Sequence, residues 1–375
     1  PFPLGSSLAA FFGLIYIQDR SSMLPPLVLA PPSGAVALDM CASPGGKTGL
    51  LAQLCGAEGL VLGNEPNPVR LGTLRRNLEI ANLFQTVTAK GPGEDLPLES
   101  GAWPYILLDP PCSGWGTVEK HPKVAKLWKG DKIKPLAGLQ RALLRRAAEL
   151  LQAGGRLVYS TCTTNSAENE EQVAWAEENL ALRPESFSDP RAENAPSVTL
   201  LHVAGGEGEG QGFFVALLKK EALPATAQPP RAEEDSSAAW WANYRERLLP
   251  RAVLDSACLD STRLPPGELA AFGDSLIFMP AKAAGLLPEK LAWRGFGLGK
   301  FTGGAARPSP RLRALMSADA DCPALNVEEP EPIRRLLSGN SLNFAGQGRE
   351  VGLYFRNLPL GLLRLRGGRV MWSEG

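Results

Sequence analysis

The chain has 375 residues, enough for roughly two or three domains with well-buried cores. Its apolar fraction of 44% and charged fraction of 21% are typical of soluble globular proteins. Lys plus Arg and Asp plus Glu both number 39, so the zero net charge excludes a global attraction to nucleic acid. Any such binding must use local basic patches.

The histidines and cysteines argue against a metal site. Only His121 and His202 are present, and the six cysteines lie far apart with no CxxC pair. Because no disulfide-rich spacing occurs either, the sequence predicts a reducing, cytoplasmic compartment.

An apolar run occupies residues 8–17, near the start of the chain. It is too short to span a bilayer, which takes about 20 residues. No basic stretch precedes it and no cleavage signature follows it, so we expect neither a signal peptide nor membrane association. We expect residues 1–34 to be the remnant of an N-terminal segment that packs on the next domain.

A glycine-rich loop follows the first predicted strand, at residues 35–40, and leads into a helix that ends near Cys55. Such glycines let the backbone approach a ligand, and free helix N–H groups favour polar or anionic groups. Cys41 replaces the first glycine of a phosphate-binding P-loop, and GxGxxG is absent, which disfavours both nucleotide motifs. The candidate cofactor residues here are Cys41, Ala42, Ser43, Pro44, Gly45, Gly46 and Lys47.

The second predicted strand, at residues 60–65, ends in a carboxylate. In doubly wound nucleoside-binding folds an acid at this position accepts hydrogen bonds from ribose hydroxyls, which makes Glu65 a candidate cofactor residue. Alternatively, Glu65 caps the helix that starts near Asn67, and both roles are compatible. The helix is expected over residues 68–83, with an apolar stripe of Val69, Leu74, Leu78 and Ala81.

An acid and a thiol follow the buried strand predicted at residues 105–108. The segment reads Asp109-Pro110-Pro111-Cys112-Ser113-Gly114, and its prolines end the strand because proline offers no N–H to a ladder. A later strand, at residues 156–160, runs into Cys162. Because the carboxyl ends of strands meet at the ligand-binding edge of an open α/β sheet, the two cysteines could lie close together.

The order of elements predicts an α/β domain at residues 35–222. Strands alternate with helices, and two strand candidates at residues 197–203 and 212–219 then form an antiparallel hairpin. This pattern indicates a Rossmann-like, mostly parallel sheet with an antiparallel end. A segment rich in proline, alanine and charge follows, and we expect a linker at residues 223–250.

The C-terminal part is expected to be β-rich and to bind RNA. Short apolar runs punctuated by Gly and Pro predict a basic intermediate module at residues 251–320 and a last module at 321–375. Residues 281–313 carry seven Lys or Arg against one acid, with aromatic residues between them. Earlier in the chain, residues 120–146 carry nine Lys or Arg against one acid. RNA contact and ordinary solvated surface both remain open, and the candidate RNA-binding residues are Lys120, His121, Lys300 and Arg356.

The motifs together indicate a methyltransferase that uses S-adenosylmethionine. Enzymes that methylate exocyclic amines carry an aromatic residue after the Asp-Pro-Pro prolines, whereas this chain has Cys112. A thiol suits a different reaction, because a thiolate that adds to carbon 6 of cytosine makes carbon 5 nucleophilic enough to take a methyl group.

At this point the sequence resembles the bacterial RNA cytosine-5 methyltransferases with two active-site cysteines, the NOL1/NOP2/Sun type, and most closely their small-subunit ribosomal RNA methyltransferase F branch. The fold that this implies is a seven-stranded methyltransferase sheet with a smaller PUA-like RNA-binding region at residues 321–375. The resemblance is carried, in order, by residues 16–25, 39–48, 109–114 and 160–163.

The resemblance implies that Cys162 is the nucleophile, that Cys112 helps to release the product, and that Asp109 contacts the cytosine and the cofactor. The loop at residues 41–47 and Glu65 would hold S-adenosylmethionine. We also predict a lowered pKa for Cys162.

One departure from the family pattern concerns the acid that usually follows the third strand, where this chain has Lys90-Gly91-Pro92-Gly93. Glu94 or Asp95 could replace it. The expected substrate is small-subunit ribosomal RNA and the protein is expected to be a monomer without metal. Transfer RNA methylation and an inactive RNA-binding assembly factor remain alternatives.

Overall fold

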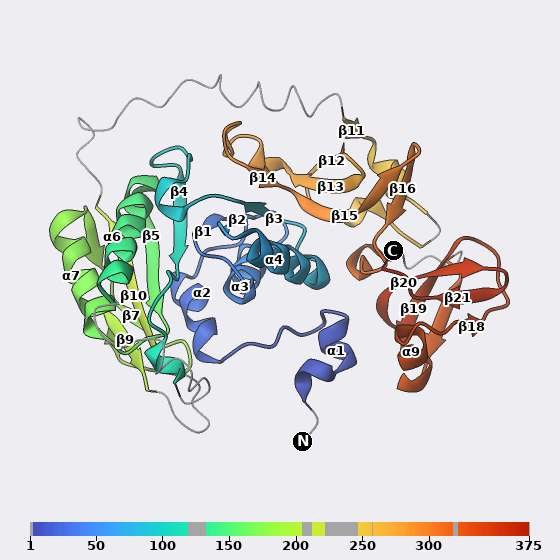
Figure 1. Cartoon of the computed structure of the whole chain (residues 1–375), viewed down its shortest axis with the longest axis horizontal. Helices are drawn as coiled ribbons and strands as arrows, with labels where there is room; N and C mark the ends of the chain where they lie inside the picture. The colour runs from blue at the N-terminus through green and yellow to red at the C-terminus, as the bar shows by residue number, and fades with distance from the viewer. Residues whose placement is uncertain are drawn as a thin grey trace.

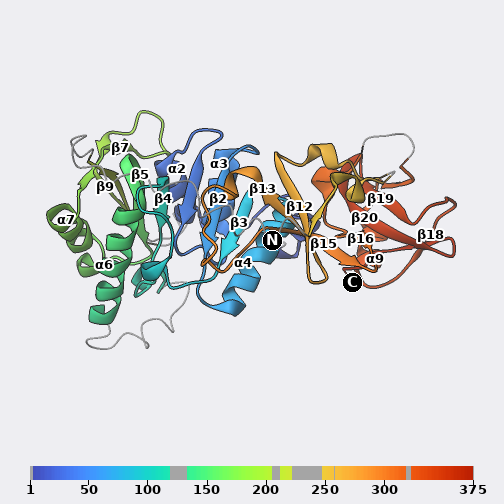
Figure 2. The same ribbon diagram turned by 90° about the horizontal axis from the view of Figure 1, so that it is seen from above.

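The computed structural model describes residues 3–118, 133–204, 212–221, 247–256, 258–317 and 322–374. Its strands form three large sheets that follow one another along the molecule, from the N-terminal half to the C-terminus (Figures 1 and 2). The predicted α/β architecture with a β-rich C-terminal region is confirmed.

The first sheet has nine strands, in the order β14-β3-β2-β1-β4-β5-β10-β6, with β9 beside β10. The five neighbouring strands β3, β2, β1, β4 and β5 are parallel to one another. Strand β10 runs antiparallel to β5, β6 and β9. The mostly parallel sheet with an antiparallel end is therefore as predicted. Its members are β1 Val36–Asp39, β2 Leu60–Asn64, β3 Thr86–Ala89, β4 Trp103–Leu108, β5 Leu151–Thr161, β6 Leu182–Pro184, β9 Leu200–Val203, β10 Phe213–Lys220 and β14 Trp293–Arg294. Strands β7 Phe187–Ser188 and β8 Ser197–Val198 form a separate small pair.

Helices cover both faces of this sheet because its central strands are apolar on both sides. Ala37 of β1 packs with helices α2, α3 and α4, whereas its neighbour Leu38 packs with α6 and α7 on the other face. The bounds of the helices are α2 Leu24–Leu29, α3 Gly46–Cys55, α4 Pro68–Ala81, α6 Ile133–Leu150 and α7 Glu170–Asn179.

The predicted apolar stripe of α4 is partly wrong. Leu71, Leu74 and Leu78 are its buried residues, whereas Val69 is 78% exposed. Val69 lies in the first turn, where the amide of this residue bonds to the N-cap side chain and the helix has not yet reached the sheet.

The second and third sheets have five strands each. In the second they are β11 Leu248–Leu249, β12 Gly267–Phe272, β13 Ser275–Pro280, β15 Phe296–Thr302 and β16 Ala305–Pro308. In the third they are β17 Ala324–Val327, β18 Leu342–Asn343, β19 Glu350–Phe355, β20 Leu358–Arg366 and β21 Arg369–Met371, with helix α9 Pro330–Leu337.

The N-terminal segment packs on the third sheet rather than only on the domain that follows it. Phe12 is 3% exposed and belongs to the same apolar cluster as Val351 and Ile333, and helix α1, Leu8–Phe11, lies against that cluster. Residues 15–17 of the expected buried run are instead exposed. Only the first part of the apolar run is therefore buried, because only that part meets an apolar surface.

A disulfide joins Cys258 to Cys322 between the second and third sheets. No disulfide was predicted from the sequence, because these residues are 64 positions apart and follow no recognisable spacing. Folding brings their Cα atoms to 4.7 Å. In the described ranges, no helix has the length and hydropathy needed to cross a membrane.

Candidate active site

The glycine-rich loop connects β1 to α3 at the carboxyl edge of the first sheet. Gly45 has φ of 112°, a left-handed conformation that favours glycine, and it stands at the N-terminus of α3. The loop is tied to α4, because Ser43 Oγ donates to the Arg70 carbonyl and Asn77 Nδ2 donates to the Pro44 carbonyl. The first-turn amides of α3 have no acceptor within the helix and can bind a polar ligand.

The segment around Tyr16 lies directly on this loop. A Cβ atom added to Gly46 would be 2.5 Å from Gln18 Oε1 and 3.0 Å from Tyr16 Cε1. A side chain at position 46 would displace the end of the Gln18 side chain, so the first motif of the family resemblance covers the second.

Glu65 follows β2 and has 4% side-chain exposure. Its Oε1 accepts a hydrogen bond from the Asn67 amide at 2.9 Å, and its Oε2 lies 3.4 Å from Arg70 Nε. The N-cap of α4 is Asn67, whose side chain accepts from two amides of the first turn. Glu65 therefore positions the capping residue instead of capping the helix itself, and its carboxylate stays at the sheet edge.

Asp109, at the end of β4, is held by two side chains. Lys47 Nζ lies 2.8 Å from Oδ2, and Ser160 Oγ donates to Oδ1 at 2.8 Å. Burial lowers the pKa of Lys47, but the charge and hydrogen bond of Asp109 raise it by more, so the ammonium form is maintained. Lys47, a predicted cofactor residue, is the ion-pair partner of Asp109, and its Nζ lies 5.3 Å from the ring centre of Phe213.

Cys112 and Cys162 lie side by side, with their Sγ atoms 2.9 Å apart. Their hydrogen bond lowers the pKa of Cys162, and the Lys47 charge lowers it further against the opposing effects of burial and Asp109. The same hydrogen bond, together with burial, raises the pKa of Cys112 well above its usual range. Cys162 is thus favoured as the thiolate and Cys112 as the thiol that donates to it, in the direction predicted from the sequence.

A buried polar network fixes both cysteine turns. Glu168 Oε1 accepts from the Ser113 amide at 2.9 Å and from Gln140 Nε2 at 3.1 Å. Gln140 also donates to the Pro111 carbonyl, and Tyr159 Oη donates to the Glu168 carbonyl. The sequence analysis missed Gln140, although a polar residue on the apolar stripe of α6 is a signal that could have indicated it.

Asp39, the last residue of β1, is a further buried acid that the sequence analysis did not single out. It is 1% exposed, and it accepts hydrogen bonds from Thr48 Oγ1 at 2.7 Å and from the Cys41 amide at 3.3 Å. Burial raises the pKa of this carboxyl to about 7, in spite of the opposing bond from Thr48.

Among the remaining predicted residues, the two that the structure describes, Lys300 and Arg356, lie outside this cluster. Lys120 and His121 lie outside the described residues. Lys300 is exposed on β15 of the second sheet, and Arg356 lies in the turn after β19, where Nε donates to the Glu328 carbonyl.

The two acids offered as substitutes after β3 differ in exposure. Glu94 is half-buried and Asp95 exposed, in a short turn at Gly93–Asp95. Within the described ranges, no group of three or more His, Cys, Asp or Glu side chains could hold a metal.

The fold and the site together define the class of S-adenosylmethionine-dependent methyltransferases. The cofactor fits the residues present, since the free amides of α3 and the buried carboxylate of Glu65 lie at the same sheet edge. Among solved structures, NSun6 from Pyrococcus horikoshii with SFG, an analogue of this cofactor, is similar. It has a TM-score of 0.52 and 29% identity, and the match covers 59% of this chain and 56% of that one.

The sequence matches the family described as 16S rRNA methyltransferase RsmB/F over residues 26–219. A ribosomal RNA small subunit methyltransferase F from Shewanella amazonensis is 32% identical over 98% of this chain and 80% of its own length. Its counterpart from Salmonella heidelberg is 38% identical over 60% of this chain, and this match spans only 49% of that relative. The chain belongs to the 16S rRNA methyltransferase RsmB/F family.

Proposed function

We propose that this protein transfers a methyl group from S-adenosylmethionine to carbon 5 of a cytosine in small-subunit ribosomal RNA. The observation that carries the proposal is the pair of thiols 2.9 Å apart at the carboxyl edge of the sheet, beside the Lys47–Asp109 ion pair. Two thiols with pKa values shifted in opposite directions suit a reaction that needs both a nucleophile and a proton acceptor.

The thiolate of Cys162 forms the covalent bond in this proposal. Its Sγ adds to carbon 6 of cytosine, and the electron pair of the carbon 5–carbon 6 double bond becomes available at carbon 5. The cofactor, when bound, supplies an electrophilic methyl group. Lys47 and Asp109 offer a charged hydrogen-bonding pair to the polar edge of the base while charge develops on the ring.

Cys112 completes the reaction by removing a proton. After methyl transfer, carbon 5 carries both the methyl group and its original hydrogen. Once the sulfur of Cys162 is bonded to carbon 6, it no longer carries the negative charge of a thiolate. It therefore no longer favours the protonated form of Cys112. Cys112, which is only partly buried, then loses its own proton to water. As a thiolate it takes the carbon 5 proton, and the electron pair of that C–H bond re-forms the ring double bond and expels Cys162 as a thiolate.

The RNA substrate is proposed from the names of the relatives and from the basic C-terminal part. We assign the catalytic domain to residues 35–222, a linker to 223–250, and RNA-binding modules to 251–320 and 321–375, the last of them PUA-like. Lys120, His121, Lys300 and Arg356 would contact RNA. We propose that the protein acts as a cytoplasmic monomer, and transfer RNA is the alternative substrate.

The test is methylation of purified RNA. The protein is incubated with S-adenosylmethionine carrying a labelled methyl group and with either small-subunit particles, naked small-subunit RNA or transfer RNA. Nucleoside analysis should show label in 5-methylcytidine from small-subunit RNA. Label in transfer RNA alone would select the alternative substrate, and label in an N4- or 2′-O-methylated nucleoside would refute carbon 5 chemistry. Cofactor binding without transfer to any of these RNAs would favour an inactive assembly factor.

A further inference from the structure

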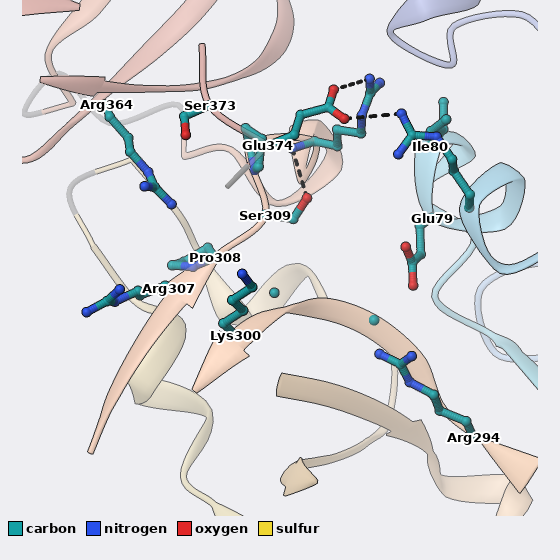
Figure 3. A pocket seen from close by; sticks show the side chains of 15 residues that line it. Glu79, Ile80, Arg294, Lys300, Arg307, Pro308, Ser309, Arg364, Ser373 and Glu374 are labelled. Atoms are coloured by element: carbon teal, nitrogen blue, oxygen red, sulfur yellow. Dashed lines mark hydrogen bonds and ion pairs between the residues drawn. The ribbon is translucent and has the colours of Figure 1, made fainter. Parts of the chain in front are cut away.

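A basic hollow lies where helix α4, the second sheet and the C-terminal segment meet (Figure 3). Its volume is about 210 Å³. The lining comes from α4, β14, β15, β16, β20 and the segment after β21, so residues from all three sheets contribute. Its six basic side chains are Arg76, Arg294, Lys300, Arg307, Arg311 and Arg364.

Part of this positive charge is already neutralised. Glu374 pairs with Arg311 and, at 3.1 Å, with Arg76. Glu79 faces the hollow beside Arg294, and burial raises the pKa of this carboxyl. These pairs hold the C-terminal segment against α4 and form one wall.

The opposite wall carries three further cations, Lys300, Arg307 and Arg364. Lys300, Arg307 and Arg364 are exposed and line the hollow, and Figure 3 shows the side chains of Lys300 and Arg364 extending toward the same space. No ion pair joins any of the three to an acidic side chain in the described ranges. The charge of this wall is therefore available to a ligand.

Lys300 and Arg307 are direct cross-strand neighbours on β15 and β16. Like charges that stand opposite each other on antiparallel strands destabilise the pair. An anion bound between them removes this repulsion and gains charge-assisted hydrogen bonds, for which arginine and phosphate are geometrically matched. A phosphate group bound between the two side chains would therefore offset their repulsion.

We propose that this hollow binds backbone phosphates of the RNA substrate, away from the target base. This inference rests on the proposed function for the identity of the RNA. In the strand order, β14, which contributes Arg294 to the hollow, lies four positions from β4, so the two strands are at least roughly 19 Å apart at about 4.8 Å per strand. A stacked RNA strand covers this distance in about six nucleotides at about 3.4 Å each. An RNA segment that contacts both the cysteine pair and the hollow must therefore be at least about six nucleotides long.

The test uses the whole protein with Lys300→Ala and Arg307→Ala combined, and a labelled single-stranded RNA in a fluorescence anisotropy titration. The matched control combines Lys290→Ala and Arg335→Ala, two exposed cations that do not line the hollow. Loss of two phosphate contacts should weaken binding about 25-fold at 0.1 M salt and reduce the slope of log K against log salt by about 1.4. The control should change neither quantity appreciably.

Two further measurements test the repulsion between Lys300 and Arg307 and the assignment of the hollow to RNA. The thermal midpoint of the Lys300/Arg307 variant should equal or exceed that of the wild type, because a repulsive pair is removed; a lower midpoint would overturn the repulsion argument. Inorganic phosphate at constant ionic strength should not compete at low millimolar concentration. If it does, the site serves free phosphate and the assignment to RNA is wrong.

Failure of this inference is distinguishable from failure of the proposed function. If the wild type forms 5-methylcytidine and the variant binds RNA like the control, the hollow is not a phosphate site. If the wild type methylates no RNA but the variant loses affinity and salt dependence, the hollow binds RNA and the catalytic proposal is the part that is refuted.

Discussion

Among single residues, Asp39 couples the protonation of the site to the stability of the fold. Its carboxyl is buried at the end of β1, with a pKa of about 7 against an ordinary value of 3.8. The folded protein therefore holds this proton more tightly than the unfolded chain does. The resulting stabilisation is complete below pH 3.8 and is lost as the pH rises through about 7.

Asp39→Asn should remove this pH dependence. Thr48 Oγ1 lies 3.1 Å from the Ala42 carbonyl, so its hydroxyl can donate there and accept from the new amide. Between pH 5 and pH 8 the wild type should lose about 2–3 kcal/mol of unfolding free energy from this group, and the variant should not. Urea denaturation at both pH values measures this difference, and parallel losses in the two proteins would contradict it.

Part of the site could be predicted at this scale and part could not. Cys112 and Cys162 could be placed together, because both follow strands that end at one sheet edge. The pairing of Lys47 with Asp109 could not, because a long side chain on a glycine-rich loop has several partners within reach. The position of Gln140 on the apolar stripe of α6 indicates that it is buried, but its bond to Glu168 could not be predicted, because Glu168 comes from a separate segment.

At the scale of elements, the turn after β4 is packed against the start of β10. The Gly116 amide donates to the Cys162 carbonyl at 3.0 Å, and the Gly116 carbonyl accepts from Gly212 at 2.9 Å. Backbone therefore contacts backbone directly behind Cys162, and the two cysteine segments can shift only together.

Gly116→Ala should misplace Cys162. The added Cβ would lie 2.1 Å from the Gly212 carbonyl oxygen and 2.9 Å from that of Cys162, where backbone has to move. A displacement of this size at a reacting group should lower kcat about 100-fold, measured as initial methylation rates at saturating RNA and cofactor.

The matched control for this variant is Gly138→Ala in helix α6. Its added methyl group would meet nothing within 4 Å, so it should leave kcat unchanged and stabilise the helix by about 0.5–1 kcal/mol. Equal kcat values for the Gly116 variant and this control would show that the backbone contact does not position Cys162.

At the scale of the whole molecule, strand pairing and hydrogen bonds join the second sheet to the first, in addition to the chain that connects them. Strand β14 adds to the edge of β3, and Asn82, at the end of α4, bonds to the later segment in both directions. Its Nδ2 donates to the Arg311 carbonyl at 2.9 Å, and its Oδ1 accepts from the Ala314 amide at 3.0 Å. These contacts couple the catalytic domain to the basic hollow.

Asn82→Gly should loosen this coupling while keeping the backbone shape. The residue has φ of 58°, which glycine adopts freely, but the Arg311 carbonyl and the Ala314 amide lose their partner. We expect a loss of about 1–3 kcal/mol and faster hydrogen exchange over residues 311–314. The exposed Asn194, with φ of 60°, provides the control Asn194→Gly, which should stay within about 0.5 kcal/mol of the wild type. Unchanged exchange in the Asn82 variant would argue against the coupling.

The extent to which the whole fold could be predicted has a physical limit. The α/β domain could be recognised because its strands, loops and helices follow one another locally. Strand β14 could not, because two residues of a distant segment complete an edge whose position only the folded sheet defines. The disulfide between Cys258 and Cys322 depends in the same way on the approach of two separate sheets.

The most direct test of the account compares the two cysteine variants for covalent RNA adducts. Cys112→Ala protein, incubated with RNA and S-adenosylmethionine, should accumulate an RNA-bound species that survives denaturation on a gel, because the proton at carbon 5 is not removed. Cys162→Ala should neither methylate RNA nor trap it. An adduct formed by Cys162→Ala, or by neither variant, would contradict the assignment of Cys162 as the nucleophile.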